Sequence, residues 1–182
     1  MKEGIILYKS KYGAAKKYAG WLQENTHFEC MEISKADISE VMQYETVILC
    51  GGIYASGIAG LSFLKKNMGR LRNKKTAILC VGASPYDEKA IAEIKAHNLT
   101  GDLKNIPIFY GRGAWDEKRM KFMDRALSRM LHGLIAKKDP ATYEPWMEAL
   151  MCAYGKSCDW TDKKYIYPLL NHLGKRLPLE TE

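Results

Sequence analysis

Three short loops in this sequence carry the residue types that bind small polar or planar ligands. The first contains Ser10, Lys11, Tyr12, Gly13, Ala14 and Ala15. It stands between a short apolar run, residues 5–8, and a segment whose apolar residues recur at helical spacing. A glycine turn that leads from a strand into a helix gathers backbone N–H groups, and the helix dipole adds to their attraction for an anion. We therefore interpret this loop as a phosphate-binding loop.

The other two loops combine a tyrosine with glycine or serine. The second loop contains Gly52, Tyr54, Ala55, Ser56 and Gly57, and the third contains Ser84, Pro85 and Tyr86. Glycine lets the backbone approach a flat ligand closely, and each tyrosine offers a ring that can lie against it. One loop for a phosphate and two for a planar ring indicate a mononucleotide such as FMN. Ordinary loop packing is the alternative for both tyrosines, since similar turns occur in proteins that bind nothing there.

Five apolar runs predict the strands that position these loops. They cover residues 5–8, 28–33, 46–50, 76–81 and 106–110. Helical patterns at residues 14–25, 61–71 and 87–97 separate most of them, with Asp87 as a predicted N-cap and Pro107 near the start or edge of the last strand. Strands that alternate with helices indicate an α/β fold with a parallel sheet. In such a sheet the ligand-binding loops meet at the carboxyl ends of the strands.

The chain continues well past the fifth predicted strand. Residues 116–137 are predicted to form one long helix, with an apolar stripe and an opposite basic stripe. Residues 139–159 are predicted to be irregular because they contain two prolines and a glycine, and a last helix is predicted from about residue 161. We therefore treat residues 1–182 as a single domain in which residues 116–160 form a helical extension before the last helix.

The segment SKYGAAKKYA resembles the phosphate loop of the flavodoxin family, in which a hydroxyl residue precedes a glycine and the start of the first helix. The whole chain, including the basic segment after FYGRGAW, looks like the subfamily that includes menaquinone-dependent protoporphyrinogen oxidase. The resemblance implies a flavodoxin-like three-layer sandwich with a five-stranded parallel sheet of order 2-1-3-4-5. It also implies FMN as the cofactor, bound by the three loops, and a redox partner protein or a quinone as the electron-transfer partner.

The sequence departs from the family pattern at Ala14 and Ala15, where the family usually places hydroxyl residues. A hydroxyl bonded to a charged phosphate contributes about 1.5–3 kcal/mol, which is about ten- to a hundredfold in affinity. The backbone amides of the loop and the hydroxyl of Ser10 remain. We therefore expect FMN to bind less tightly than the family pattern alone implies.

Three functions remain open on the sequence. The first is an FMN-dependent oxidoreductase linked to a quinone, and the second is an electron carrier without a substrate of its own. The third, which follows from Ala14 and Ala15, is an interaction module that holds little or no cofactor. No acid, base or nucleophile stands out as catalytic, and Cys152 and Cys158 lack the histidine pattern of a metal site.

The net charge and the cysteines indicate which binding partners and which cellular compartment to expect. The net charge of +7 suits an anionic partner, although a solvated basic surface explains it equally well, and no nucleic acid is expected. Residues 118–134 have the pattern of a basic amphipathic helix, which either packs its apolar stripe into a core or lies on an anionic membrane. Five unpaired cysteines and the lack of a signal peptide or a long apolar run predict a cytoplasmic protein. Peripheral contact with the inner membrane face stays open.

Overall fold

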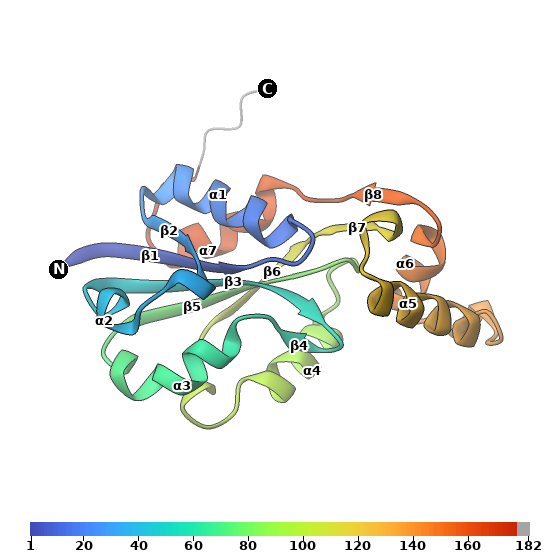
Figure 1. Ribbon diagram of the computed structural model, residues 1–182, viewed down its shortest axis with the longest axis horizontal. Coiled ribbons are helices and arrows are strands. Elements are labelled where there is room, and N and C mark those ends of the chain that lie inside the picture. The colour runs from blue at the N-terminus through green and yellow to red at the C-terminus, as the bar shows by residue number, and fades with distance from the viewer. Residues whose placement is uncertain (178–182) are drawn as a thin grey trace.

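The computed structural model describes residues 1–177, and its main feature is a parallel sheet between two layers of helices (Figure 1). The sheet has the order β2-β1-β3-β5-β6. The bounds of these strands are Lys2–Lys9 (β1), Glu29–Glu32 (β2), Tyr44–Tyr54 (β3), Lys75–Gly82 (β5) and Ile108–Arg112 (β6). Counted along the chain, this is the predicted order 2-1-3-4-5. A short strand, β4 (Gly57–Ile58), pairs antiparallel with the end of β3.

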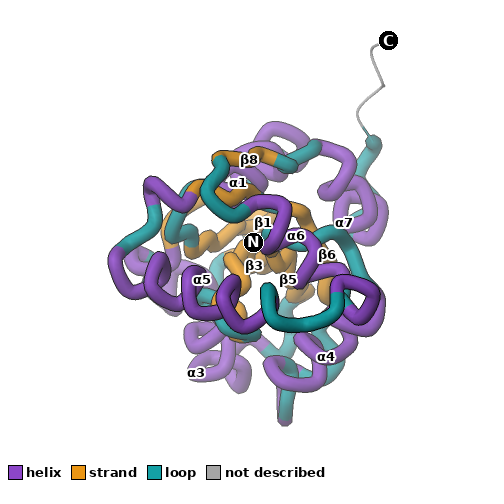
Figure 2. Tube along the Cα trace, turned by 90° about the vertical axis from the view of Figure 1, so that its right-hand side faces the viewer, coloured by secondary structure: helices purple, strands orange, loops and turns teal. Residues whose placement is uncertain are grey.

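Helices cover both faces of the sheet (Figures 1 and 2). On one face lie α1 (Ala14–Thr26) and α7 (Tyr167–His172), and on the other lie α2 (Ile38–Val41), α3 (Leu61–Leu71) and α4 (Glu88–Asn98). Short 3-10 turns occupy Ile33–Lys35, Gly101–Leu103, Glu117–Arg119, Pro140–Thr142 and Lys163–Ile166. The predicted N-cap of α4 is confirmed, because the Asp87 side chain accepts the Ala90 N–H at 2.7 Å. Positions 178–182 of the predicted domain lie outside the described residues.

The central strands are buried on both faces, as their continuous apolar runs predict. Ile6 of β1 packs with Tyr18 and Leu22 of α1 in one core. Its neighbours Ile5 and Leu7 belong to the other core, on the α3 side of the sheet. Because successive strand residues point to opposite faces, an unbroken apolar run supplies both cores at once.

The strand register brings the predicted ligand loops to one end of the sheet. Lys9 at the end of β1 pairs with Gly51 of β3, and Gly52 pairs with Val81 near the end of β5. The loops that follow these strands therefore lie side by side at the carboxyl ends, where the strand order reverses between β1 and β3.

The extension folds into a small assembly at this same end of the molecule (Figure 2). Its elements are β7 (Ala114–Asp116), α5 (Phe122–Ile135), α6 (Pro145–Ala153) and β8 (Ser157–Asp159), and β7 pairs antiparallel with β8. The prediction of one helix from residue 116 was wrong for its first six residues. There β7 ends at Asp116, whose side chain accepts the Lys118 N–H at 3.1 Å and so begins a 3-10 turn.

The prediction that residues 139–159 are irregular was also wrong, because this segment contains α6 and β8. Pro145 is the first residue of α6. A proline at this position lacks only an N–H that has no partner within the helix, so it starts the helix instead of breaking it. Pro168 takes a similar place in the first turn of α7.

Candidate functional site

The loop after β1 turns sharply into α1. Gly13 is the N-cap of this helix and has φ 103°, a conformation that a side chain would strain. Its N–H donates to the Ser10 side-chain oxygen at 3.0 Å. Ser10 therefore holds the turn in shape, while the hydrogen of its own hydroxyl stays available to a ligand.

Four backbone N–H groups at this turn have no hydrogen-bond acceptor within residues 1–177; they belong to Tyr12, Ala14, Ala15 and Lys16. The first turn of α1 carries no acidic residue. Free N–H groups at the start of a 13-residue helix form a set of donors that suits an anion. The donor chemistry of this loop therefore fits the phosphate group of a mononucleotide.

The side chain of Tyr54 lies across the gap between the ends of β1 and β3. Its hydroxyl accepts the Lys11 N–H at 3.1 Å, so this amide already has a partner. The ring lies over Gly52, where an added Cβ would come within 2.8 Å of its carbons. The ring of Tyr12 meets that of Tyr54 edge-on at 6.3 Å. Tyr54 therefore covers the backbone at Gly52 and holds the first loop through the Lys11 N–H.

Tyr54 stands at the base of a tight hairpin between β3 and β4. The two turn residues, Ala55 and Ser56, have φ of 46° and 65°, as in the turn type usual for two-residue hairpins. Asn98, a buried residue at the end of α4, donates to the Ser56 carbonyl at 2.6 Å and accepts the Ile58 N–H at 3.1 Å. Asn98 was missed by the sequence analysis, because a single polar residue at a helix end gives no signal of this contact.

The third loop is held from β6. The Tyr110 hydroxyl donates to the Ser84 carbonyl at 2.5 Å, and Arg112 donates to the Ala83 carbonyl at 3.2 Å. Burial raises the pKa of Tyr110, which keeps this hydroxyl a donor. Tyr86 is 60% exposed, and its ring lies 6.1 Å from that of Tyr110. Pro85 and Tyr86 therefore lie at the predicted end of the sheet. Among the aromatic pairs of the described residues, the rings of Tyr86 and Tyr54 do not contact each other.

An acidic residue from the extension reaches the first loop, which the sequence analysis did not predict. The Asp124 carboxylate, in the first turn of α5, accepts a hydrogen bond from the Tyr12 phenol and pairs with the Lys11 ammonium group. The bond with Lys11 and then that with Tyr12 hold the pKa of Asp124 below its ordinary value. The Lys121 N–H also donates to the Tyr12 hydroxyl at 3.2 Å. The start of the extension is thus bonded to the loop after β1.

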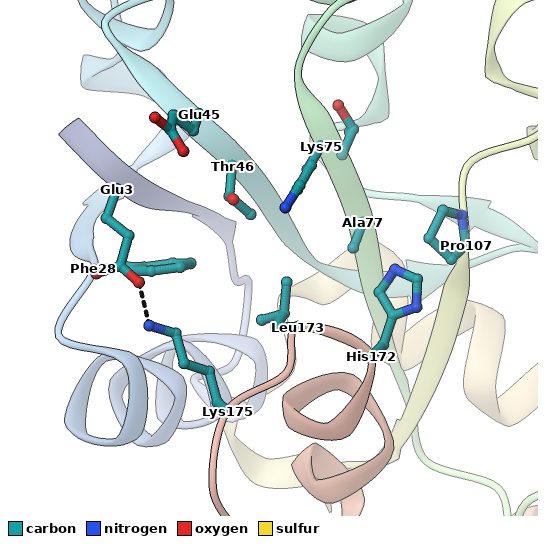
Figure 3. Close-up of a pocket in the computed structure, with 11 residues that line it drawn as sticks. Glu3, Phe28, Glu45, Thr46, Lys75, Ala77, Pro107, His172, Leu173 and Lys175 are labelled. Carbon is teal, nitrogen blue, oxygen red and sulfur yellow. Dashed lines mark hydrogen bonds and ion pairs between the residues drawn. The ribbon is translucent and has the colours of Figure 1, made fainter. Parts of the chain in front are cut away.

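Two cavities lie away from these loops. One, of about 460 Å³, lies at the amino ends of β3 and β5, beside the ion pair of Glu3 and Lys175 (Figure 3). The other, of about 450 Å³, is lined by Glu117, Lys118, Arg125, Arg129, Tyr154 and Gly155 of the extension. Neither is lined by residues of the three predicted loops.

The cysteines form no metal site in the described residues, where no three His, Cys, Asp or Glu side chains gather. Cys50 and Cys80 are buried in the cores, and burial raises the pKa of Cys80 to about 12. These two residues fill core space as uncharged thiols.

A parallel sheet whose order reverses between β1 and β3, with a glycine turn into α1 at that point, defines a doubly wound class of α/β protein. Within that class, the chain belongs to the flavodoxin domain family, which matches residues 5–142. The family expected from the phosphate loop is therefore confirmed. Membership supports a flavin-binding redox protein.

Solved structures resemble the chain only distantly, and no curated protein matches it. A WrbA-like flavodoxin from Agrobacterium tumefaciens is 12% identical, with 69% of this chain and 88% of that chain covered and a TM-score of 0.48. The Trp repressor binding protein from Bacillus subtilis is 16% identical, with 62% and 84% covered and a TM-score of 0.47. A Fusobacterium nucleatum flavodoxin bound to flavin mononucleotide is 13% identical, with 59% and 69% covered and a TM-score of 0.36.

Proposed function

We propose that this protein binds FMN at the carboxyl ends of β1 and β3 and transfers electrons through it. The observation that carries the proposal is the turn at Gly13, with four N–H groups free to receive a phosphate. When bound, the flavin supplies the redox chemistry, while the protein holds it and excludes water. The amides of Tyr12, Ala14, Ala15 and Lys16 hold the phosphate, and the loops at residues 52–57 and 84–86 flank the ring.

Lys11 and Tyr54 adjust to the cofactor in this proposal. Tyr54 turns away from Gly52 and presents its ring to the flavin, and the Lys11 N–H then joins the phosphate donors. The Lys11 ammonium group balances the phosphate charge together with the start of α1. Because Ala14 and Ala15 add no hydroxyl, binding rests on main-chain groups and on Ser10.

The more specific form of the proposal is an oxidoreductase that passes electrons from a substrate to a quinone, as in the protoporphyrinogen oxidase subfamily that the chain resembles. An electron carrier that serves a redox partner protein is the alternative. Turnover of protoporphyrinogen with menaquinone by the FMN-loaded protein supports the first. If the flavin is bound but no turnover occurs, the second is supported.

A cofactor-free interaction module is a second candidate, and a specific observation favours it. The Tyr54 hydroxyl already accepts the Lys11 N–H, and the Asp124 carboxylate already pairs with the Lys11 ammonium group. The protein thus supplies its own partners to part of the loop. In this candidate function, the protein's own side chains occupy the loop after β1, and the loop holds no cofactor.

A titration with FMN separates the two candidates. Loss of flavin fluorescence and a shift of the visible absorption spectrum are expected on binding. Riboflavin, which lacks the phosphate, is expected to bind far more weakly, because the proposed site holds the cofactor mainly by that group. Equal binding of the two flavins contradicts the assignment of the Gly13 turn as the phosphate site. No binding of either supports the interaction module.

A further inference from the structure

The outward face of α5 is almost entirely apolar. Its exposed side chains include Phe122 (82% exposed), Met123 (74%), Leu127 (44%), Met130 (55%) and Leu134 (53%). Ala126 and Gly133 are also exposed, and Arg129 is the one charged residue among the exposed positions of this helix. A solvated surface helix normally turns polar residues outward. α5 instead turns apolar residues outward. The helix lies at the end of the molecule that faces the viewer in Figure 2.

The inner side of α5 is firmly packed, which fixes the direction of this apolar face. Ile135 is buried in a small core with Met147 and Leu150 of α6. The Arg125 side chain donates to three carbonyl groups in residues 117–120, at 2.7 to 3.1 Å. His132 stacks on Tyr154 with ring centres 3.7 Å apart. The exposed face is therefore a fixed feature of the fold.

The two acidic residues between residues 117 and 138, Glu117 and Asp124, are turned inward. Asp124 is bound to Lys11 and Tyr12 of the first loop. Glu117 is buried, accepts the Gly155 N–H at 3.0 Å and lies 3.5 Å from the Arg129 side chain. Their charges are thus matched within the protein.

From residue 117 to residue 138, all exposed charges are positive, and the exposed acidic residues Asp139, Glu144 and Glu148 follow in the next segment. Between residues 117 and 138, the exposed charged side chains are Lys118, Arg119, Lys121, Arg129, Lys137 and Lys138. Three precede the helix, one lies along it and two follow it, so both ends of the apolar face carry cations.

We propose that α5 is a membrane-contact helix that lies flat on an anionic lipid surface. Its apolar face, made of Phe122, Met123, Leu127, Met130 and Leu134, enters the boundary between headgroups and acyl chains, and the flanking cations pair with lipid phosphates. The charges favour this occupant over a second copy of the chain, because two such faces would bring like charges together. None of the helices in residues 1–177 has the length and apolar character of a membrane span. This contact goes beyond the proposed redox function and does not depend on flavin.

Sedimentation with lipid vesicles tests the proposal without any flavin. The full chain is expected to sediment with vesicles that contain phosphatidylglycerol, to stay in solution with vesicles of phosphatidylcholine alone, and to be released by salt. The double variant Lys118→Gln/Lys121→Gln is expected to bind about thirtyfold more weakly, since each cation near an anionic surface contributes about fivefold. The matched control Lys65→Gln/Lys66→Gln makes the same charge change on α3, away from α5, and is expected to bind like the unaltered protein.

The apolar contribution is tested with Met123→Gln/Leu127→Gln, whose exposed positions leave the cores intact. Weaker vesicle binding with an unchanged circular dichroism spectrum supports insertion of this face. No sedimentation with either kind of vesicle overturns the proposal, as does an equal loss in the α3 control. A third outcome assigns the face to a second copy of the chain instead. In it, the unaltered chain does not bind vesicles but forms a dimer in light scattering, and Met123→Gln/Leu127→Gln abolishes that dimer.

Discussion

The Asp124 carboxylate of α5 accepts the hydrogen bond of the Tyr12 phenol in the loop after β1, although 112 positions separate the two residues. The same carboxylate pairs with the Lys11 ammonium group. A fixed negative charge from the extension thus stands beside the loop that the family uses for a phosphate. This contact couples the extension to the candidate cofactor site and leads to the first two predictions.

Asp124→Asn is expected to tighten FMN binding by up to about fivefold. The substitution removes a negative charge that repels the phosphate and frees the Lys11 ammonium group for it, and partly exposed charge interactions are worth up to about 1 kcal/mol. Isothermal titration calorimetry measures the change. Glu93→Gln, the same chemical change at an exposed position of α4, is the control and should leave the affinity unaltered. Weaker FMN binding by Asp124→Asn indicates instead that the carboxylate supports the loop.

The contribution of Asp124 to stability is expected to disappear in acid. Its pKa in the folded protein is lowered from 3.8, chiefly by Lys11. A carboxylate of this kind stabilises the fold above its ordinary pKa, and that stabilisation is lost as the pH falls through the lowered value. The unaltered protein should therefore melt slightly above Asp124→Asn at neutral pH, with the difference shrinking below about pH 4. Thermal unfolding of both proteins across this range tests the point, and a difference independent of pH contradicts it.

Two substitutions at Tyr54 are expected to have opposite effects. Tyr54→Phe keeps the ring but frees the Lys11 N–H, which should tighten FMN binding by up to about tenfold, the contribution of one hydrogen bond. Tyr54→Ala removes the ring that the proposal places against the flavin, which should weaken binding by about five- to a hundredfold. Fluorescence titration gives both affinities. If Tyr54→Ala binds FMN more tightly than Tyr54→Phe, the ring blocks the site and does not flank the flavin.

Ala14→Ser is expected to tighten FMN binding by about tenfold or more, because a hydroxyl on a charged phosphate contributes about 1.5–3 kcal/mol. Ala14 is half-buried at the start of α1, whereas Ala15 is buried in the core, so Ala14 is the position where a hydroxyl can reach a ligand. The affinity for riboflavin should not change, since it has no phosphate. A gain for riboflavin as large as that for FMN locates the new contact away from the phosphate.

Asn98→Ala is expected to destabilise the fold by about 2 kcal/mol, since it leaves the Ile58 N–H and the Ser56 carbonyl without their partner. In a chain of this size that lowers the melting temperature by about 4–8 °C. Asn67→Ala is the matched control, because the Asn67 side chain bonds only to the Phe63 carbonyl within its own helix, at 2.8 Å. Melting curves decide the matter: equal losses in the two variants argue against a special role for Asn98.

The sequence by itself determined the layered fold and the place of the glycine turn before α1. The run at residues 5–8 required a strand buried on both faces, and Gly13 before a helical pattern required a sharp turn into a helix. These features are local, since strand burial, glycine turns and helix caps depend on neighbours within a few residues. The strand order followed from the family resemblance, not from the pattern itself.

Only the tertiary structure decided how the loops and the extension meet. Asp124 reaches Tyr12, Asn98 holds the hairpin at Ser56, and Tyr54 lies over Gly52 because distant elements pack together there. The apolar stripe at residues 122–134 was compatible with a core or with a surface, and its exposure was settled by which side of α5 packs on α6. Helical periodicity shows that a helix has two sides, but only the packing of its neighbours shows which of them is buried.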